Sequence, residues 1–156
     1  MVHAATVTSA QRAAPLDGEI TFCARPRTDE VDAAVALVAG EYWNASTAPA
    51  TIRRAHLGSP IWVGARDPSG ALIATARAIS DGAKHAWIYD VGVAPSWRGR
   101  GIGRALLGLL LDDPLIRDVR QVHLQTRDAE DFYARFGFIA HPPGGQPRYV
   151  LTRETR

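Results

Sequence analysis

The sequence predicts a single domain of the α/β (α+β) class, in which helices flank one mixed central sheet. Three middle segments, residues 60–67, 71–80 and 84–95, have the residue types and turn spacing of consecutive antiparallel strands. Residues 28–40 and 100–111 have the pattern of helices, and a strand, a helix and two more strands follow the second of them. With 156 residues, the chain is long enough for one hydrophobic core and too short for two.

The first strand and the first helix come early in the chain. Residues 20–25, ITFCAR, alternate between apolar and polar as a short strand does. Thr28 and Asp29 can then open a helix that runs to about Gly40. Its apolar residues have helical spacing: Val31, Ala34, Val35 and Val38.

A second, short helix is expected after the residues EYWN. Ser46 or Thr47 would be its N-cap, because a hydroxyl can accept a hydrogen bond from a free N–H group of the first turn. Pro49 is tolerated in that first turn, where its missing N–H group costs nothing.

The middle of the chain predicts a three-stranded meander. The turn DPSG joins strands 60–67 and 71–80, and Asp81 and Gly82 lead into the third strand. Strict alternation along this third strand places Ile88 and Asp90 on one face. It places the following residues on the other face: Trp87, Tyr89, Val91 and Val93.

The last part of the chain predicts a helix, a strand, a helix and two strands. The helix at 100–111 ends near Pro114, and QVHLQT at 121–126 is the next strand. Asp128 can cap a helix that continues through Phe136. The segments FGFIA and PRYVLTR close the domain as two strands.

Composition limits the function classes. Residues 1–18 lack the charged start and apolar block of a secretory signal, so we expect a disordered leader there and the domain at 19–156. Cys23 is the single cysteine, which excludes an internal disulfide and a cysteine-based metal cage and fits a reducing cytoplasm. The net charge of +2 is too small to argue for nucleic acid, and apolar runs such as 105–111 are shorter than a membrane span.

The segment VGVAPSWRGRGIGRALL, residues 91–107, predicts an anion site. A helix start after a strand and a glycine loop presents free N–H groups and a positive dipole end. Here the loop consists of Arg98, Gly99, Arg100, Gly101, Ile102 and Gly103, and Arg104 follows it. A pyrophosphate suits this loop, whereas neither the dinucleotide fingerprint GxGxxG nor the phosphate loop GxxxxGK is present.

These residues also carry a family resemblance. RGRGIG matches the (Gln/Arg)-x-x-Gly-x-(Gly/Ala) signature of the GNAT superfamily of acetyl-CoA-dependent N-acyltransferases. TRDAEDFYARFGF, at 126–138, is similar to the second hallmark of that family. EYWN and ARAISDG resemble a bacterial branch with SYW and ARVVTD segments. The resemblance covers roughly 20–152, and it departs from the family at Thr126, often asparagine, and at Gly92, often a larger residue.

The resemblance implies a GNAT-like fold and acetyl-CoA as cosubstrate. It places the pyrophosphate on the backbone of the glycine loop and the pantetheine arm beside Val91, Gly92 and Val93. An extended amide chain can pair with an open strand edge. Backbone groups around residues 90–93 must then be unpaired, and we hypothesise a bulge or a splaying of the strands there.

Direct transfer to a primary amine requires a proton acceptor and a proton donor. Asp90 is the first choice as base, ahead of Glu41 and of Asp81, which we also assign to the acceptor side. Tyr133 matches the position of the acid that protonates the departing thiolate. The alternatives are structural: Asp90 can pair with an arginine or cap a turn, and Tyr133 can be a core aromatic.

Tyr42 and Trp43 resemble the rim of the acceptor site, where aromatic rings can hold an amine by cation–π contact, although core packing is an equal alternative. The thioester oxygen is expected to meet the N–H group of Val91 or a neighbour. His85 and His123 have no metal-ligand spacing, and we expect no metal.

The expected partner is a small-molecule or peptide amine, with no nucleic-acid or membrane partner and a homodimer left open. Two rival functions remain at this stage. One is a non-catalytic acetyl-CoA-binding module of the same fold, and the other is a basic nucleic-acid-binding protein.

Overall fold

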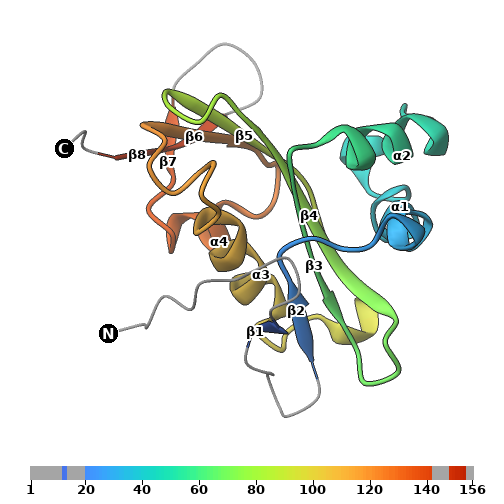
Figure 1. The fold of residues 1–156 in the computed structure, drawn as a ribbon. Coiled ribbons are helices and arrows are strands. Elements are labelled where there is room, and N and C mark those ends of the chain that lie inside the picture. The colour runs from blue at the N-terminus through green and yellow to red at the C-terminus, as the bar shows by residue number, and fades with distance from the viewer. Residues whose placement is uncertain (1–11, 14–19, 142–147, 154–156) are drawn as a thin grey trace.

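The computed structural model describes residues 12–13, 20–141 and 148–153, and its elements follow the predicted order (Figure 1). The strands are β1 Arg12–Ala13, β2 Thr21–Cys23, β3 Ile61–Arg66, β4 Leu72–Ser80, β5 His85–Val93, β6 Gln121–Gln125, β7 Ile139–His141 and β8 Arg148–Thr152. The α-helices are α1 Val31–Val38, α2 Pro49–Gly58, α3 Ile102–Leu111 and α4 Glu130–Ala134. Short 3-10 helices are η2 Thr28–Glu30, η3 Tyr42–Asn44 and η4 Pro95–Trp97.

The strands form one mixed sheet, as predicted. The described residues form eight strands in the order β1-β2-β3-β4-β5-β6-β8-β7. Only the β5–β6 pair is parallel among the strand pairs of these residues, and the others are antiparallel. The predicted α/β (α+β) class with one mixed central sheet is therefore confirmed.

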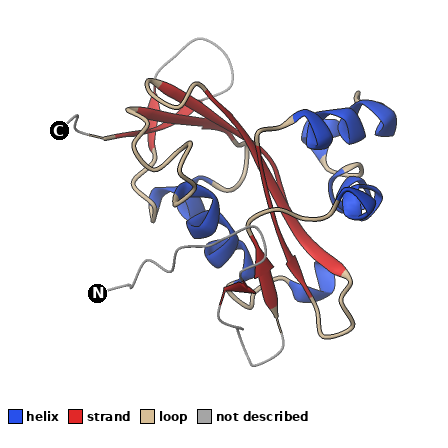
Figure 2. Ribbon diagram, viewed as in Figure 1, coloured by secondary structure: helices blue, strands red, loops and turns tan. Residues whose placement is uncertain are grey.

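Helices cover both faces of the sheet. Helices α1 and α2 lie on one side of the central strands, and α3 and α4 lie on the other (Figures 1 and 2). The larger core cluster lies between α3 and the sheet, where Leu106, Leu107 and Leu110 are fully buried. Each such side chain contributes about 1.5–3 kcal/mol of transfer free energy. This packing holds the start of α3, and with it the glycine loop, against the end of β5.

Two predicted N-caps are wrong. Helix α2 has Ala48 as its N-cap, with no capping side chain, because Pro49 occupies the first helical position. Helix α4 begins at Glu130 and ends at Ala134, and Asp128 does not cap it. Instead the Thr126 hydroxyl accepts a hydrogen bond from the N–H group of Ala129 at 3.0 Å.

Within the range 1–18, expected to be a leader, Arg12–Ala13 form β1 and pair with β2 opposite Cys23 and Phe22. The exposed edge of β2 offers backbone groups for this pairing. The rest of the range 1–18 lies outside the described residues. Among the described residues, no helix is long and apolar enough to cross a bilayer.

Candidate active site

Strand β5 contains a bulge, as hypothesised from the sequence. Thr75 pairs with Gly92 and Arg77 pairs with Tyr89, so two residues of β5, Asp90 and Val91, lie opposite the single residue between Thr75 and Arg77. Asp90 has a φ of 52°, in the left-handed region that an aspartate tolerates better than most residues. The bulge adds one residue to β5 and bends the strand.

The bulge reverses the side-chain faces beyond Tyr89. Strict alternation predicted Val91 and Val93 on the face of Trp87 and Tyr89, and this prediction is wrong. Val93 pairs with Ala74, and both valines pack against the α3 core. Asp90 correspondingly does not share the face of the buried Ile88.

Strands β5 and β6 separate beyond a short parallel pairing. Their pairing runs from His85 opposite Gln121 to Trp87 opposite His123 and stops there, although β5 continues to Val93. From Ile88 onward, the β5 edge that faces β6 therefore has no strand partner among the described residues. The predicted splaying is confirmed.

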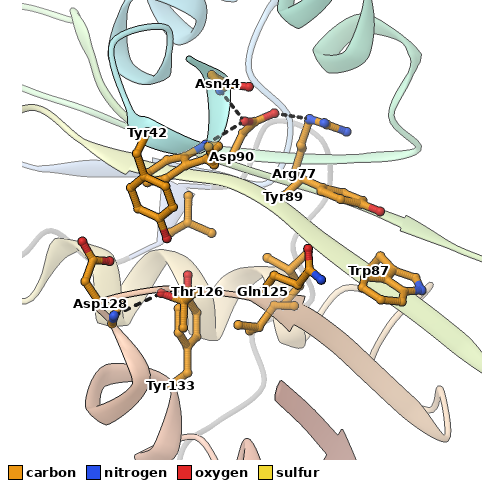
Figure 3. Close-up of a pocket in the computed structure, with 15 residues that line it drawn as sticks. Tyr42, Asn44, Arg77, Trp87, Tyr89, Asp90, Gln125, Thr126, Asp128 and Tyr133 are labelled. Atoms are coloured by element: carbon orange, nitrogen blue, oxygen red, sulfur yellow. Dashed lines mark hydrogen bonds and ion pairs between the residues drawn. The ribbon is translucent and has the colours of Figure 1, made fainter. Parts of the chain in front are cut away.

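A pocket of about 340 Å³ occupies this separation (Figure 3). It lies between β5, β6, η3 and the loop before α4. Its lining is Tyr42, Trp43, Asn44, Arg77, Trp87, Ile88, Tyr89, Asp90, Val91, Leu124, Gln125, Thr126, Asp128, Ala129 and Tyr133. Five predicted site residues thus come together from segments far apart in the sequence: Tyr42, Trp43, Asp90, Val91 and Tyr133.

Asp90 is buried and fully engaged by donors. Its Oδ1 accepts hydrogen bonds from Trp43 Nε1 at 3.1 Å and Asn44 Nδ2 at 2.8 Å, and its Oδ2 accepts one from Arg77 Nε at 2.6 Å. Burial by itself would raise the pKa of Asp90, but the hydrogen bonds from Arg77 and Asn44 and the charge of Arg77 outweigh it and lower the pKa. A carboxylate with a lowered pKa is a poor proton acceptor. The pairing of Asp90 with Arg77 is the structural alternative to a base role that the sequence left open.

Tyr133 projects from α4 into the pocket (Figure 3). Tyr133 is 8% exposed, and its ring packs edge-on against Phe138 and Phe132. Burial raises the pKa of the Tyr133 hydroxyl, and Tyr42 and Asp128 raise it further. The hydroxyl is therefore protonated at neutral pH, and it has no hydrogen-bond partner among the described residues.

Tyr42 and Trp43 form the opposite wall of the pocket. Their rings meet edge to face at 5.1 Å between centroids, and Trp43 is 40% exposed. The Tyr42 hydroxyl accepts a hydrogen bond from the N–H group of Arg127 at 2.8 Å, and the Arg127 guanidinium lies 3.9 Å from the Tyr42 ring centroid. These contacts connect η3 to the loop before α4 across the pocket.

The glycine loop has the free backbone donors that the sequence predicted. The N–H group of Arg98 bonds to Pro95 O and that of Ala105 bonds to Gly101 O, and the N–H groups of residues 99–104 have no acceptor among the described residues. Gly99 and Gly101 have φ values of 76° and 79°, which favour glycine strongly. The loop thus combines free donors with a helix N-terminus, an arrangement that fits a pyrophosphate.

The loop is attached to the open end of β5. Arg98 Nε donates to the Val93 carbonyl at 2.9 Å, and its Nη2 lies 3.0 Å from Glu41 Oε1. Arg100 stacks on Trp97 at 4.6 Å from the ring centroid. The open β5 edge therefore runs from the pocket to the glycine loop.

Gly92 has a packing role that the sequence did not predict. A Cβ on Gly92 would lie 2.7 Å from Val38 Cγ1, so a larger residue at this position would displace α1. The departure from the family pattern at this position therefore allows close helix–sheet packing.

Two other predicted carboxylates lie outside the pocket lining. Asp81 accepts hydrogen bonds from the N–H groups of Ala83, Lys84 and His85 in the exposed β4–β5 turn, and the bond from His85 is the largest cause of its lowered pKa. Asp81, assigned from the sequence to the acceptor side, thus lies outside the lining of this pocket, because an aspartate before a glycine turn bonds to the local backbone. Glu41 pairs with Arg98.

The pocket lining also includes residues that the sequence did not assign to the site, among them Arg77, Asn44 and Asp128. Arg77 and Asn44 are partners of Asp90 at sequence separations of 13 and 46, which no local pattern indicates. Asp128 was assigned to a helix cap. Its position directly after strand 121–126, where pocket residues often lie, is the signal that could have identified it.

A histidine pair lies where β5 and β6 are still paired. His85 Nδ1 and His123 Nε2 are 2.9 Å apart, and Trp87 stacks on His123. Within the described ranges, no three His, Cys, Asp or Glu side chains are grouped as a metal site would require.

Comparisons with known proteins agree with this geometry. A family model described as the acetyltransferase (GNAT) family matches residues 28–138. The protein GCN5-related N-acetyltransferase 2, chloroplastic, of Arabidopsis thaliana is 40% identical over 82 residues, which are 52% of this chain and 32% of that protein. The chain thus spans about a third of the length of this curated relative.

Solved structures share the fold. A protein assigned to the GNAT family from Xanthomonas campestris pv. campestris has a TM-score of 0.70 at 30% identity, covering 80% of this chain and 85% of that chain. Rv2747 from Mycobacterium tuberculosis, solved in complex with CoA, has a TM-score of 0.65 at 19% identity, covering 83% of this chain and 98% of that chain. At 19% identity, the similarity to Rv2747 shows a shared fold and no more.

Proposed function

Because the chain belongs to the GNAT family of acetyltransferases, we propose that it transfers an acetyl group from acetyl-CoA directly to a primary amine. Acyltransferase activity and acetyl-CoA as cosubstrate are general to this family. The observation that carries the proposal is one continuous surface. Free N–H groups at residues 99–104 lead along the open edge of β5 to a pocket that contains Tyr133.

The residues of this surface fit the parts of the cosubstrate. The glycine loop suits the pyrophosphate, and Arg100 and Arg104 carry positive charge beside it. The open edge from Ile88 to Val93 offers backbone groups to the amides of the pantetheine arm. We keep the expectation that the thioester oxygen meets the N–H group of Val91 or a neighbour.

Tyr133 is the proposed acid. When the amine nitrogen attacks the acetyl carbon, the C–S bond breaks and the thiolate takes the hydroxyl proton of Tyr133. The raised pKa of Tyr133 keeps this proton in place until the thiolate forms. Apolar surroundings also raise the pKa of a thiol. The pKa values of the donor hydroxyl and of the acceptor thiol therefore rise together.

Asp90 is proposed as a positioning residue rather than as the base. Its three donors fix Trp43 and Asn44 of η3 against Arg77 of β4. Asp90 thereby holds the rim of the pocket on the sheet, and the proton acceptor must be another group.

The test is release of CoA thiol from acetyl-CoA across alkylamines, arylamines and peptides with free amines. We expect release with at least one amine and a fall of about 10²- to 10⁴-fold in kcat for Tyr133→Phe, with acetyl-CoA affinity preserved. Affinity is measured separately by calorimetry. Tight acetyl-CoA binding without thiol release for any amine would instead support the non-catalytic binding module.

A further inference from the structure

We propose that Asp128 binds the ammonium group of the acceptor and takes its proton during transfer, so that the site selects amines that are cationic at neutral pH. This inference rests on the proposed acetyl transfer. It supplies the proton acceptor that the engaged state of Asp90 leaves unassigned.

The charges of the pocket single out Asp128. Three charged side chains line the pocket: Arg77, Asp90 and Asp128. Arg77 and Asp90 neutralise each other through a contact of 2.6 Å. The Asp128 carboxylate has no hydrogen bond or ion pair among the described residues, and the residue is exposed. The pocket therefore contains one uncompensated negative charge, which attracts a cation.

The loop that carries Asp128 is held on both sides. The preceding residue, Arg127, donates its N–H group to the Tyr42 hydroxyl and lays its guanidinium on the Tyr42 ring. The following residue, Ala129, donates its N–H group to the Thr126 hydroxyl. These contacts fix the Asp128 backbone at the pocket while leaving its carboxylate available.

The surroundings of Asp128 suit an amine that reacts beside Tyr133. Figure 3 shows the Asp128 side chain on the same side of the pocket as Tyr42 and Tyr133. The charge of Asp128 is close enough to Tyr133 to raise the pKa of that hydroxyl. The partly exposed Trp43 ring, which also lines the pocket, offers a cation–π contact to the same ammonium group.

The proton balance of the step is complete. The acceptor nitrogen begins as an ammonium with three protons and ends as an amide with one. One of its two lost protons passes through Asp128 to solvent, and the other replaces, through solvent, the proton that Tyr133 gives to the thiolate. The N–C bond forms as the C–S bond breaks, with net release of one proton.

The test compares Asp128→Asn with Asp131→Asn, which removes the same charge from α4 outside the pocket lining. Each protein is assayed by thiol release with an alkylamine, protonated at pH 7, and with an arylamine, neutral at pH 7. For Asp128→Asn we expect kcat/KM to fall about 10²- to 10⁴-fold with the alkylamine and less than about 10-fold with the arylamine. An arylamine nitrogen becomes acidic enough on attack to lose its proton to water. Asp131→Asn should match the unmodified protein with both amines.

Two further measurements keep the outcomes distinct. Asp128→Glu should restore part of the alkylamine activity, and calorimetry with acetyl-CoA should give the same Kd for all variants. Unchanged alkylamine activity in Asp128→Asn, an equal loss with both amines, or a loss of acetyl-CoA binding would overturn the role of Asp128 while the transferase function stands. No thiol release by the unmodified protein would overturn both proposals.

Discussion

Replacing Asp90 with asparagine should destabilise the protein strongly. Asparagine tolerates the left-handed backbone at this position, where φ is 52°, so the substitution tests the charge and not the bulge. It leaves the Arg77 guanidinium without its counterion, and the Arg77 side chain is only 13% exposed. Because donors face both oxygens of Asp90, the NH2 group of the new amide also meets a donor in either orientation of the side chain.

The expected magnitude follows from this burial. Removing one partner of a buried ion pair costs about 3–5 kcal/mol. Arg77 keeps a second contact, from its Nη1 to the Ser59 hydroxyl at 3.2 Å, which favours the lower end of that range. A loss of about 3 kcal/mol corresponds to a decrease of about 6–12 °C in Tm for a chain of this size.

The assay is urea unfolding followed by tryptophan fluorescence, with the Cm and m values compared between variants. Asp32→Asn breaks the exposed Arg53–Asp32 pair and is the matched control, expected to cost less than about 1 kcal/mol. The double variant Arg77→Gln with Asp90→Asn should recover part of the stability, since it removes the uncompensated charge.

A loss below about 1 kcal/mol for Asp90→Asn would refute this reasoning. If turnover also disappeared while stability hardly changed, Asp90 would be the general base that the sequence first suggested. The two roles are thus separated by measuring unfolding and thiol release on the same variant.

Three further predictions concern the acid, the glycine loop and pH. Tyr133→Phe should lower kcat about 10²- to 10⁴-fold in the thiol-release assay, and undiminished turnover would reject Tyr133 as the acid. Gly101→Ala should weaken acetyl-CoA binding at least about 10-fold by calorimetry and cost about 1–2 kcal/mol, because its φ is 79°. Gly108→Ala, inside α3 with no atom within 4 Å of its Cβ, should leave affinity unchanged, and equal effects of both changes would contradict a special role for the loop. The pKa values of Glu30 and Asp90 are lowered in the folded state. Their contribution to stability is therefore complete above the unfolded-state pKa values of about 4 and is lost as pH falls toward the folded-state values, which acid titration of unfolding checks. A curve that stays flat down to about pH 2 would speak against both ion pairs.

Local patterns in the sequence predicted most of the fold. Alternation and helical spacing identified the middle hairpin, the third strand and the helix after the glycine loop, since these periods appear within a short window. The glycine loop was also predictable, because its free N–H groups depend on residues adjacent in sequence. The caps at Ser46, Thr47 and Asp128 were predicted wrongly, since several nearby residues could meet the same local requirement.

The roles of the carboxylates were not predictable in the same way. Asp90, Asp81 and Asp128 are the same residue type, but Asp90 lies at the bulge inside β5, and the other two lie in connections next to strands. Asp81 bonds to its own turn, Asp90 meets donors 13 to 47 residues away, and Asp128 meets none among the described residues. Only the position of each carboxylate relative to distant chain segments separates these roles.

The sequence by itself thus determined the class of fold, the order of its elements, the glycine loop with its free N–H groups and the importance of Tyr133. The tertiary structure decided where β5 bulges, where it separates from β6 and which carboxylate keeps its oxygens free. The physical reason is the range of the interactions: periodicity and turn chemistry act between neighbours in the chain. Strand register and buried ion pairing join residues that only the folded sheet brings together.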